Sequence, residues 1–318
     1  MISVLEMGLC GRRWSQDGSK GGLVGNETLK KRRRLFSLYS ANLAIERPAA
    51  AGKYACPLCL ELYLSADVEG HAPLLTLEHI MPAGLGNAGF VLTCQRCNNT
   101  AGSGIDSNLH KQMSFAALMN GQQTGKLKSR LDYDGYPVGA TVQRTPTSLE
   151  IEIDQRRSDP ANVAKLEASM EHLTDGDELS LAFASQVAPD IKKASVAMLK
   201  AAYLKAFRHL GYRYILWDFL NPIRRAIETC EVDEIALNKI ILKVAPDQLP
   251  GEVMVVKRPE VGGLAVPLNF SKHRQTYIVI LPNDGRTHEN WRDLAIGDQL
   301  QIGSIPDSFF PWKTNNEL

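Results

Sequence analysis

Four cysteines have the spacing of a metal site. The sequence reads CPLC at residues 56–59 and CQRC at residues 94–97, with 34 residues between the two pairs. Each Cys-x-x-Cys pair can form a tight turn that offers two thiolates to one ion. Four sulfur ligands are typical of structural zinc, which prefers tetrahedral coordination and Zn–S bonds of about 2.3 Å. The spacing therefore predicts a Zn²⁺ site formed by Cys56, Cys59, Cys94 and Cys97.

The segment between the pairs carries residues that could do chemistry. It contains LEHIMP at residues 77–82, and Asn98 directly follows Cys97. A zinc ribbon needs only about 15–20 residues between its pairs, so this longer segment has room for more than a metal turn. An ion that fixes Cys97 also fixes Asn98. We therefore expect Glu78, His79 and Asn98 to converge, as a catalytic site requires of its scaffold.

Together these motifs resemble the HNH endonucleases of the ββα-metal type, in the zinc-containing branch that is similar to recombination endonuclease VII. The resemblance covers residues 50–115, about a fifth of the chain. It implies a β-hairpin followed by a helix, with structural zinc on the four cysteines. It also implies that Glu78 and Asn98 hold a catalytic Mg²⁺ or Mn²⁺ and that His79 is the general base.

Three positions depart from the family pattern. Glu78 stands where many members have Asp, which moves the ligand one methylene further from the strand. Gly89 stands where many members have the middle Asn, although the branch with Asn after the last cysteine also tends to lack it. Ala101 lies where related sequences often carry a basic residue, which affects a phosphate contact rather than the chemistry.

The reaction implied is hydrolysis of phosphodiester bonds in DNA. An imidazole is largely neutral near pH 7 and can accept a proton from water. Oxygen ligands favour hard cations such as Mg²⁺ or Mn²⁺. The alternative is a non-catalytic, zinc-stabilised module that binds nucleic acid or another protein. Restriction, phage defence, mobile-element and recombination functions are all compatible with the endonuclease hypothesis, and the sequence does not select among them.

The charge distribution agrees with a nucleic-acid partner for the first part of the chain. Residues 1–130 carry 15 Lys or Arg and 9 Asp or Glu, whereas residues 131–318 carry 21 and 26. The cysteine motifs therefore lie in a stretch with a net charge of +6, as phosphate binding requires. The rest of the chain has a net charge of −5. Asymmetry of this size is also common among proteins with other functions.

The location of the protein is predicted from its cysteines and its apolar runs. Four of the 6 cysteines belong to the metal pattern, which leaves Cys10 and Cys230 and fits a reducing compartment. The first ten residues have no basic start and only a short apolar run, so we expect no signal peptide. The sequence contains no run of about 18 apolar residues that could span a membrane. We expect a cytoplasmic protein.

Four regions are expected around these motifs, in an α+β fold. Residues 1–50 form an N-terminal extension with a basic helix, and residues 51–120 form the zinc module. Residues 121–235 mix strands and helices, and residues 236–318 are β-rich. The last two regions carry no motif for chemistry, so a partner or ligand for residues 121–318 stays open, as does the oligomeric state.

Several elements can be placed by their patterns. Residues 1–27 are rich in Gly and Ser and are expected to be poorly ordered. Strands are expected within residues 126–154 and in short runs between 238 and 303, where apolar residues alternate with polar ones or turns. Helices are expected over 161–173 and 188–210, with Gly211 as a stop, and over 212–227 with an interruption at Pro222.

Some residues have two interpretations. The basic run Lys30–Arg34 could bind the DNA backbone or be a solvated helix end that packs by its Leu and Tyr face. Partial helical spacing is given by Leu35, Leu38, Asn42 and Ile45. Asp106 and His110 share a helix face, as part of the site or, more commonly, as a surface pair. The same two choices, functional or structural, apply to His71, His209, Arg224 and Arg225.

Overall fold

The structure of the protein, a computed structural model, divides into two compact units, which are described separately. One unit lies within residues 110–190, and the other combines residues 14–109 with 191–318. The predicted boundaries at residues 50, 120 and 235 stay a prediction. The residues that the structure describes are 21–70, 72–86, 88–120, 126–133, 135–144, 148–172, 174, 182–184, 189–232, 240–244, 252–256, 263–283 and 302–304.

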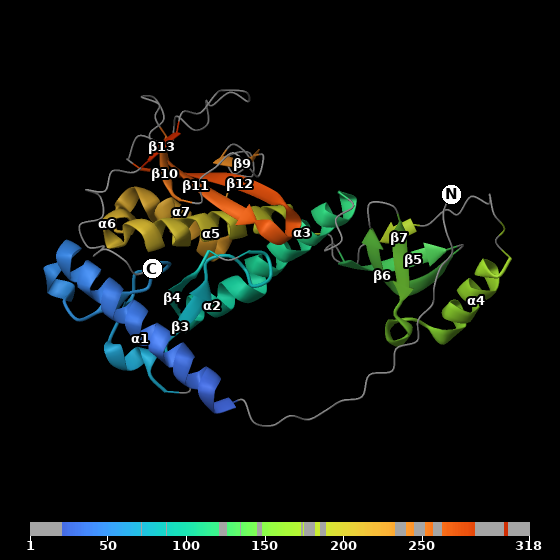
Figure 1. Cartoon of the computed structure of the whole chain (residues 1–318), viewed down its shortest axis with the longest axis horizontal. Helices are drawn as coiled ribbons and strands as arrows, with labels where there is room; N and C mark the ends of the chain where they lie inside the picture. The colour runs from blue at the N-terminus through green and yellow to red at the C-terminus, as the bar shows by residue number, and fades with distance from the viewer. Residues whose placement is uncertain are drawn as a thin grey trace. The chain divides into compact units, whose positions relative to one another are not determined.

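The larger unit begins with helix α1 (Gly21–Glu46), shown in blue in Figure 1. Its buried face is formed by Phe36, Tyr39 and Leu43, which recur at three- and four-residue spacing. A helix over the basic run and the residues after it is confirmed, but it begins at Gly21, so residues 21–27 are helical and the expectation of poor order there is wrong. Of the predicted spacing, Asn42 is buried and Leu35 and Leu38 are half-buried, whereas Ile45 is 60% exposed. Residues 1–20, most of the stretch expected to be poorly ordered, lie outside the described residues.

Two antiparallel strands and a helix then follow one another. Strand β3 (Leu75–His79) pairs with β4 (Phe90–Cys94), and α2 (Gln95–Ala101) begins at the next residue. A π-helical segment, η3 (Gly102–Asp106), leads into α3 (Ser107–Met119). The order strand, strand, helix brings the segment around Glu78 beside the second cysteine pair.

The centre of this unit is helix α5 (Ile191–Leu210), which is buried along most of its length. Gly211 ends it with a φ of 64°, a left-handed conformation that suits glycine. Helices α6 (Tyr212–Ile215) and α7 (Asn221–Thr229) follow. Pro222 lies in the first turn of α7, so the predicted interrupted helix is two separate helices.

An antiparallel sheet completes the larger unit. Its strand order is β13-β10-β11-β12-β9, and α5 contacts β11 and β12, as Figure 1 shows. These strands lie in the part of the chain that the sequence predicts to be β-rich. Their bounds are β9 (Ile241–Val244), β10 (Met254–Val256), β11 (Gly263–Phe270), β12 (Gln275–Pro282) and β13 (Ile302–Ser304).

The smaller unit is a sheet packed against one helix, α4 (Pro160–Met170). Val163 and Leu166 of α4 pack on Leu131, Val138 and Ala140 of the sheet. The strand order is β7-β6-β5-β8, with β5 (Lys126–Tyr133), β6 (Tyr136–Arg144), β7 (Leu149–Ile153) and β8 (Ala182–Ala184). The strands and the helix expected here are confirmed.

Short helical turns connect the larger elements. They are η1 (Pro48–Ala50), η2 (Ser65–Val68), η4 (Gln155–Arg157), η5 (Asp218–Leu220) and η7 (Ser271–His273). The whole is a mixed α/β protein with antiparallel sheets. Among the described residues, no helix is both long and apolar enough to cross a membrane.

Gly89, just before β4, should not tolerate a side chain. Its φ is 85°, and a Cβ atom there would lie 1.3 Å from Nη1 of Arg208, a group that donates to the Ala88 carbonyl oxygen at 3.3 Å. We expect Gly89→Ala to lower the free energy of unfolding by about 1–3 kcal/mol in urea denaturation. Gly102→Ala is the control, because φ is −60° and no atom lies within 4 Å of its Cβ position. Equal stability of the two variants would contradict this expectation.

Candidate functional site

The first cysteine pair lies in the turn between two short paired strands, β1 (Tyr54–Ala55) and β2 (Leu62–Tyr63). The Cys56 N–H donates to the Glu61 carbonyl oxygen at 2.9 Å, and the Leu60 N–H donates to the Cys56 carbonyl oxygen at 2.8 Å. These two bonds close the turn and leave both thiols on its inner side.

Buried tyrosines hold this turn in place. The Tyr203 hydroxyl of α5 donates to the Pro57 carbonyl oxygen at 2.9 Å, and Tyr212 of α6 accepts from the Ala55 N–H at 2.9 Å. Neither ring has exposed surface. The first cysteine pair is therefore anchored by helices more than 140 residues further along the chain.

The second cysteine pair lies where β4 meets α2. Cys94 is the last residue of β4, and its Sγ accepts from the Cys97 N–H at 3.4 Å in the first turn of α2. The Cys94 N–H in turn donates to the Cys56 Sγ at 3.3 Å. These bonds join the two pairs and orient their sulfur atoms.

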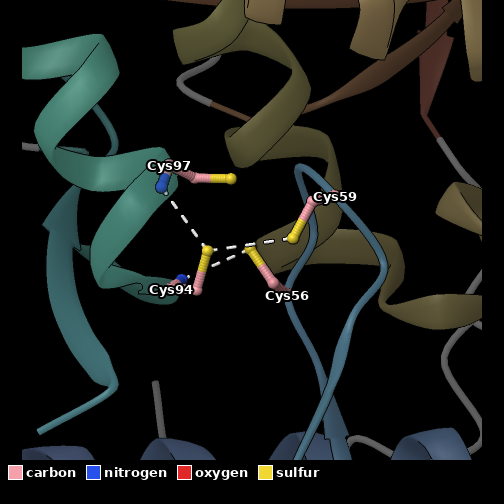
Figure 2. A group of neighbouring side chains, drawn as sticks. All are labelled: Cys56, Cys59, Cys94 and Cys97. Atoms are coloured by element: carbon pink, nitrogen blue, oxygen red, sulfur yellow. Dashed lines mark hydrogen bonds between the residues drawn. The ribbon is translucent and has the colours of Figure 1, made fainter.

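The four sulfur atoms form one cluster, and Figure 2 shows them turned towards a common centre. All four lie within 4.8 Å of one another, and Cys59 Sγ is 3.8 Å from Cys94 Sγ. A tetrahedron with Zn–S bonds of about 2.3 Å has edges of about 3.8 Å. The predicted cluster is confirmed: its cysteines lie close enough to hold a metal ion such as zinc. Cys230 lies outside it, at the end of α7.

The thiols influence one another's protonation. Burial raises the pKa of the Cys56 thiol, whereas hydrogen bonds from the other three thiols lower the pKa of Cys94. The hydrogen bond with Cys56 likewise lowers the pKa of Cys59, so two sulfurs of the cluster are favoured as thiolates, the form that binds metal.

Glu78 is buried, and its carboxylate has a partner that the sequence did not reveal. Lys200 of α5 donates from Nζ to Glu78 Oε1 at 2.5 Å and to Asp106 Oδ2 at 2.6 Å. The side chains of Lys200, Glu78 and Asp106 are 0%, 7% and 14% exposed. Burial raises the pKa of both carboxyl groups, and the ammonium opposes the shift. We call these three residues the charge cluster.

Asn98 is fixed to strand β3. Its amide nitrogen donates to Thr76 Oγ1 at 2.8 Å and to the Leu77 carbonyl oxygen at 3.3 Å. Thr76 and Glu78 are two residues apart on one strand, so their side chains point to the same face. The structure thus holds Asn98 against the two residues that precede Glu78 on β3.

His79 is the exposed last residue of β3, opposite Phe90 of β4. The centres of the His79 and Phe90 rings are 4.5 Å apart, and the Lys31 ammonium of α1 lies 5.0 Å from the centre of the Phe90 ring. Because side chains alternate along a strand, His79 is directed away from the face of Glu78. The imidazole is open to solvent, and an aromatic contact restricts its orientation.

Two hypotheses from the sequence need correction. Asp106 is bonded to buried Lys200 and does not form a surface pair with the exposed His110. Arg224 is neither a phosphate ligand nor solvated, since it is buried and donates to the Ile215 carbonyl oxygen at 2.6 Å and to Tyr203 Oη at 3.0 Å. His71 lies outside the described residues.

One signal could have revealed Lys200. It lies in the helical stripe of Val196, Tyr203 and Phe207, all of which are buried. A lysine on an apolar helix face is almost never fully buried without a charged partner. The position therefore called for a carboxylate elsewhere in the chain, although the sequence could not say which.

The fold and the site define a mixed α/β protein with four clustered cysteines that could hold a metal ion and with a buried group of charged residues. Comparisons of the chain with models of protein families, with curated proteins and with solved structures find no match.

Removing one thiol of the cluster should remove both metal and stability. We expect the Cys94→Ser protein to lose the one zinc ion bound per chain and to melt at a clearly lower temperature, because zinc binding contributes directly to folding. Zinc would be measured by elemental analysis and melting by calorimetry. Cys230→Ser is the matched control and should keep both. A Cys94→Ser protein with full zinc content and a normal melting curve would refute the four-cysteine assignment.

Proposed function

We propose that the protein is a metal-dependent endonuclease of the HNH type, built on a ββα-metal module, that hydrolyses phosphodiester bonds in DNA. The observation that carries this proposal is the arrangement around β3. Asn98 is bonded to the Thr76 side chain and the Leu77 carbonyl oxygen, on the two residues of that strand that precede Glu78. The cluster formed by both cysteine pairs fixes the segment that carries Asn98, which directly follows Cys97.

The donor chemistry fits a hard cation. Glu78 offers a carboxylate and Asn98 an amide oxygen, and both suit Mg²⁺ or Mn²⁺. The Oδ1 atom of Asp106 is buried without a hydrogen-bond partner, and the charge cluster has one ammonium for two carboxylates. This surplus of negative charge favours a cation. When bound by Glu78 and Asn98, such an ion would stabilise the charge that develops on the leaving 3′ oxygen.

His79 is the proposed general base. It is exposed at the end of β3, where water and a phosphodiester can both reach it, and the Phe90 ring supports its imidazole. A neutral imidazole accepts the proton of the attacking water, which makes a weak nucleophile effective.

Helix α1 supplies positive charge on the same side. Lys31 lies over the Phe90 ring that contacts His79, and Lys30 is also exposed. Arg33, in contrast, is bound to Glu69 by two hydrogen bonds of 2.7 and 2.8 Å, and Arg32 is buried. Arg34 is exposed but makes another interaction. Of the basic run, we therefore assign Lys30 and Lys31 to the DNA backbone.

A second candidate function is a zinc-stabilised module that binds nucleic acid or a protein without cleaving. The observation in its favour is the ion pair between Glu78 and Lys200, because it engages one oxygen of the proposed cation ligand. Cleavage assays separate the two functions.

Replacement of His79 should stop cleavage without affecting the fold. The purified protein would be incubated with duplex, single-stranded and branched DNA, with Mg²⁺, Mn²⁺ or EDTA. We expect cleavage by the wild type with a divalent ion, and a loss of at least about 100-fold in His79→Ala. Zinc content and melting should stay unchanged, and His110→Ala, which alters another exposed histidine, should cleave normally. Undiminished cleavage by His79→Ala would exclude it as the base.

Replacement of Lys31 should weaken DNA binding even where no cleavage occurs. In the His79→Ala background, we expect Lys31→Ala to bind duplex DNA more weakly and to reduce the slope of log affinity against log salt by about 1. Fluorescence anisotropy at several salt concentrations measures both. Lys165→Ala is the matched control, because its ammonium lies 4.7 Å from the centre of the Tyr136 ring. An unchanged slope for Lys31→Ala would argue against a phosphate contact.

A further inference from the structure

The charge cluster joins three segments that are distant in sequence. Glu78 comes from β3, Asp106 from the end of η3 and Lys200 from the middle of α5. Lys200 lies 122 residues from Glu78 and 94 from Asp106, and its side chain has no exposed surface. A charged ammonium can be buried so completely only because two carboxylates compensate it.

The Lys200 ammonium already occupies the place beside the Glu78 carboxylate that a bound cation would need. It lies 2.5 Å from Glu78 Oε1, an oxygen of the residue to which we assign the divalent ion. A second positive charge on the same carboxylate is repelled by the ammonium, and the repulsion is strong where water is excluded. Asp106 can keep Lys200 in place while Glu78 is shared, because Asp106 Oδ2 accepts from Lys200 Nζ at 2.6 Å and Asp106 Oδ1 has no hydrogen-bond partner that competes for it.

We propose that Lys200 determines the affinity of the cation site, as the resident counter-ion of Glu78 whose charge opposes the binding of the divalent ion. This inference rests on the assignment of Glu78 as a cation ligand. The coupling between the ammonium and the ion is reciprocal. The bound ion weakens the interaction of Glu78 with Lys200 by the same free energy by which Lys200 weakens the binding of the ion. The site consequently binds the ion more weakly than its oxygen ligands alone would.

The test is the sign of this coupling, measured without any cleavage. Zinc-loaded protein would be titrated with Mn²⁺, and free Mn²⁺ would be followed by electron paramagnetic resonance. We expect Lys200→Met to lower the half-saturating Mn²⁺ concentration by about 10-fold, within the usual range of such couplings. Glu78→Gln should abolish this binding.

A second background protects the experiment against misfolding. Lys200→Met alone leaves two buried carboxylates without a counter-charge, which can prevent folding. The same substitution in an Asp106→Asn protein leaves only one carboxylate, and the same 10-fold gain is expected relative to Asp106→Asn. Lys205→Met is the matched control from the same helix, because its ammonium donates to the Pro267 carbonyl oxygen at 2.6 Å and lies outside the cluster. It should leave the titration unchanged.

The outcomes separate this inference from the proposed function. Tighter Mn²⁺ binding on loss of Lys200 supports the inference even if the wild type cleaves no DNA, in which case the endonuclease proposal fails. Equal or weaker binding in both backgrounds overturns the inference even if the wild type cleaves. Absence of Mn²⁺ binding from every variant would leave the cluster as a structural ion pair and would overturn it as well.

Discussion

The convergence of four thiols is the constraint on which the rest of the site depends. The turn between β1 and β2 and the junction between β4 and α2 are distant in sequence, yet their sulfur atoms lie within 4.8 Å of one another. Two bonds to sulfur, from the N–H groups of Cys94 and Cys97, fix the geometry of the junction. Asn98 follows at the next position, so the cysteine cluster also determines where the Asn98 amide lies.

A second constraint ties this arrangement to the later half of the chain. Helix α5 contributes the Tyr203 hydroxyl to the first cysteine turn and the Lys200 ammonium to Glu78. The segment that carries the four cysteines is therefore not self-contained: its polar interior is completed by a helix that begins at Ile191. This explains how Glu78 can be buried as a carboxylate, since an isolated charge in that position would be very costly.

The sequence predicts what is local and misses what depends on long-range packing. The cysteine cluster can be read from two short motifs, and α5 and its stop at Gly211 from apolar spacing and one glycine. The role of Lys200 cannot be read, because its partners lie 94 and 122 residues away and their approach depends on how α5 packs against β3. For the same reason the sequence favours a surface position for Asp106 and includes Ile45 of α1, which is 60% exposed, in the helical spacing of its apolar residues. Aromatic partners on other elements, such as Phe207 beside Tyr39 at 4.5 Å, decide which face of α1 is buried.

In the proposed site, one ion on four sulfurs positions Asn98, which holds a second, oxygen-bound ion together with Glu78. The most direct measurement of this arrangement is anomalous diffraction at the zinc and manganese edges from crystals of His79→Ala grown with DNA and Mn²⁺. We expect a zinc peak among Cys56, Cys59, Cys94 and Cys97, and a manganese peak shared by Glu78, Asn98 and a phosphate. Manganese bound elsewhere, or no metal among the sulfurs, would contradict the proposed site.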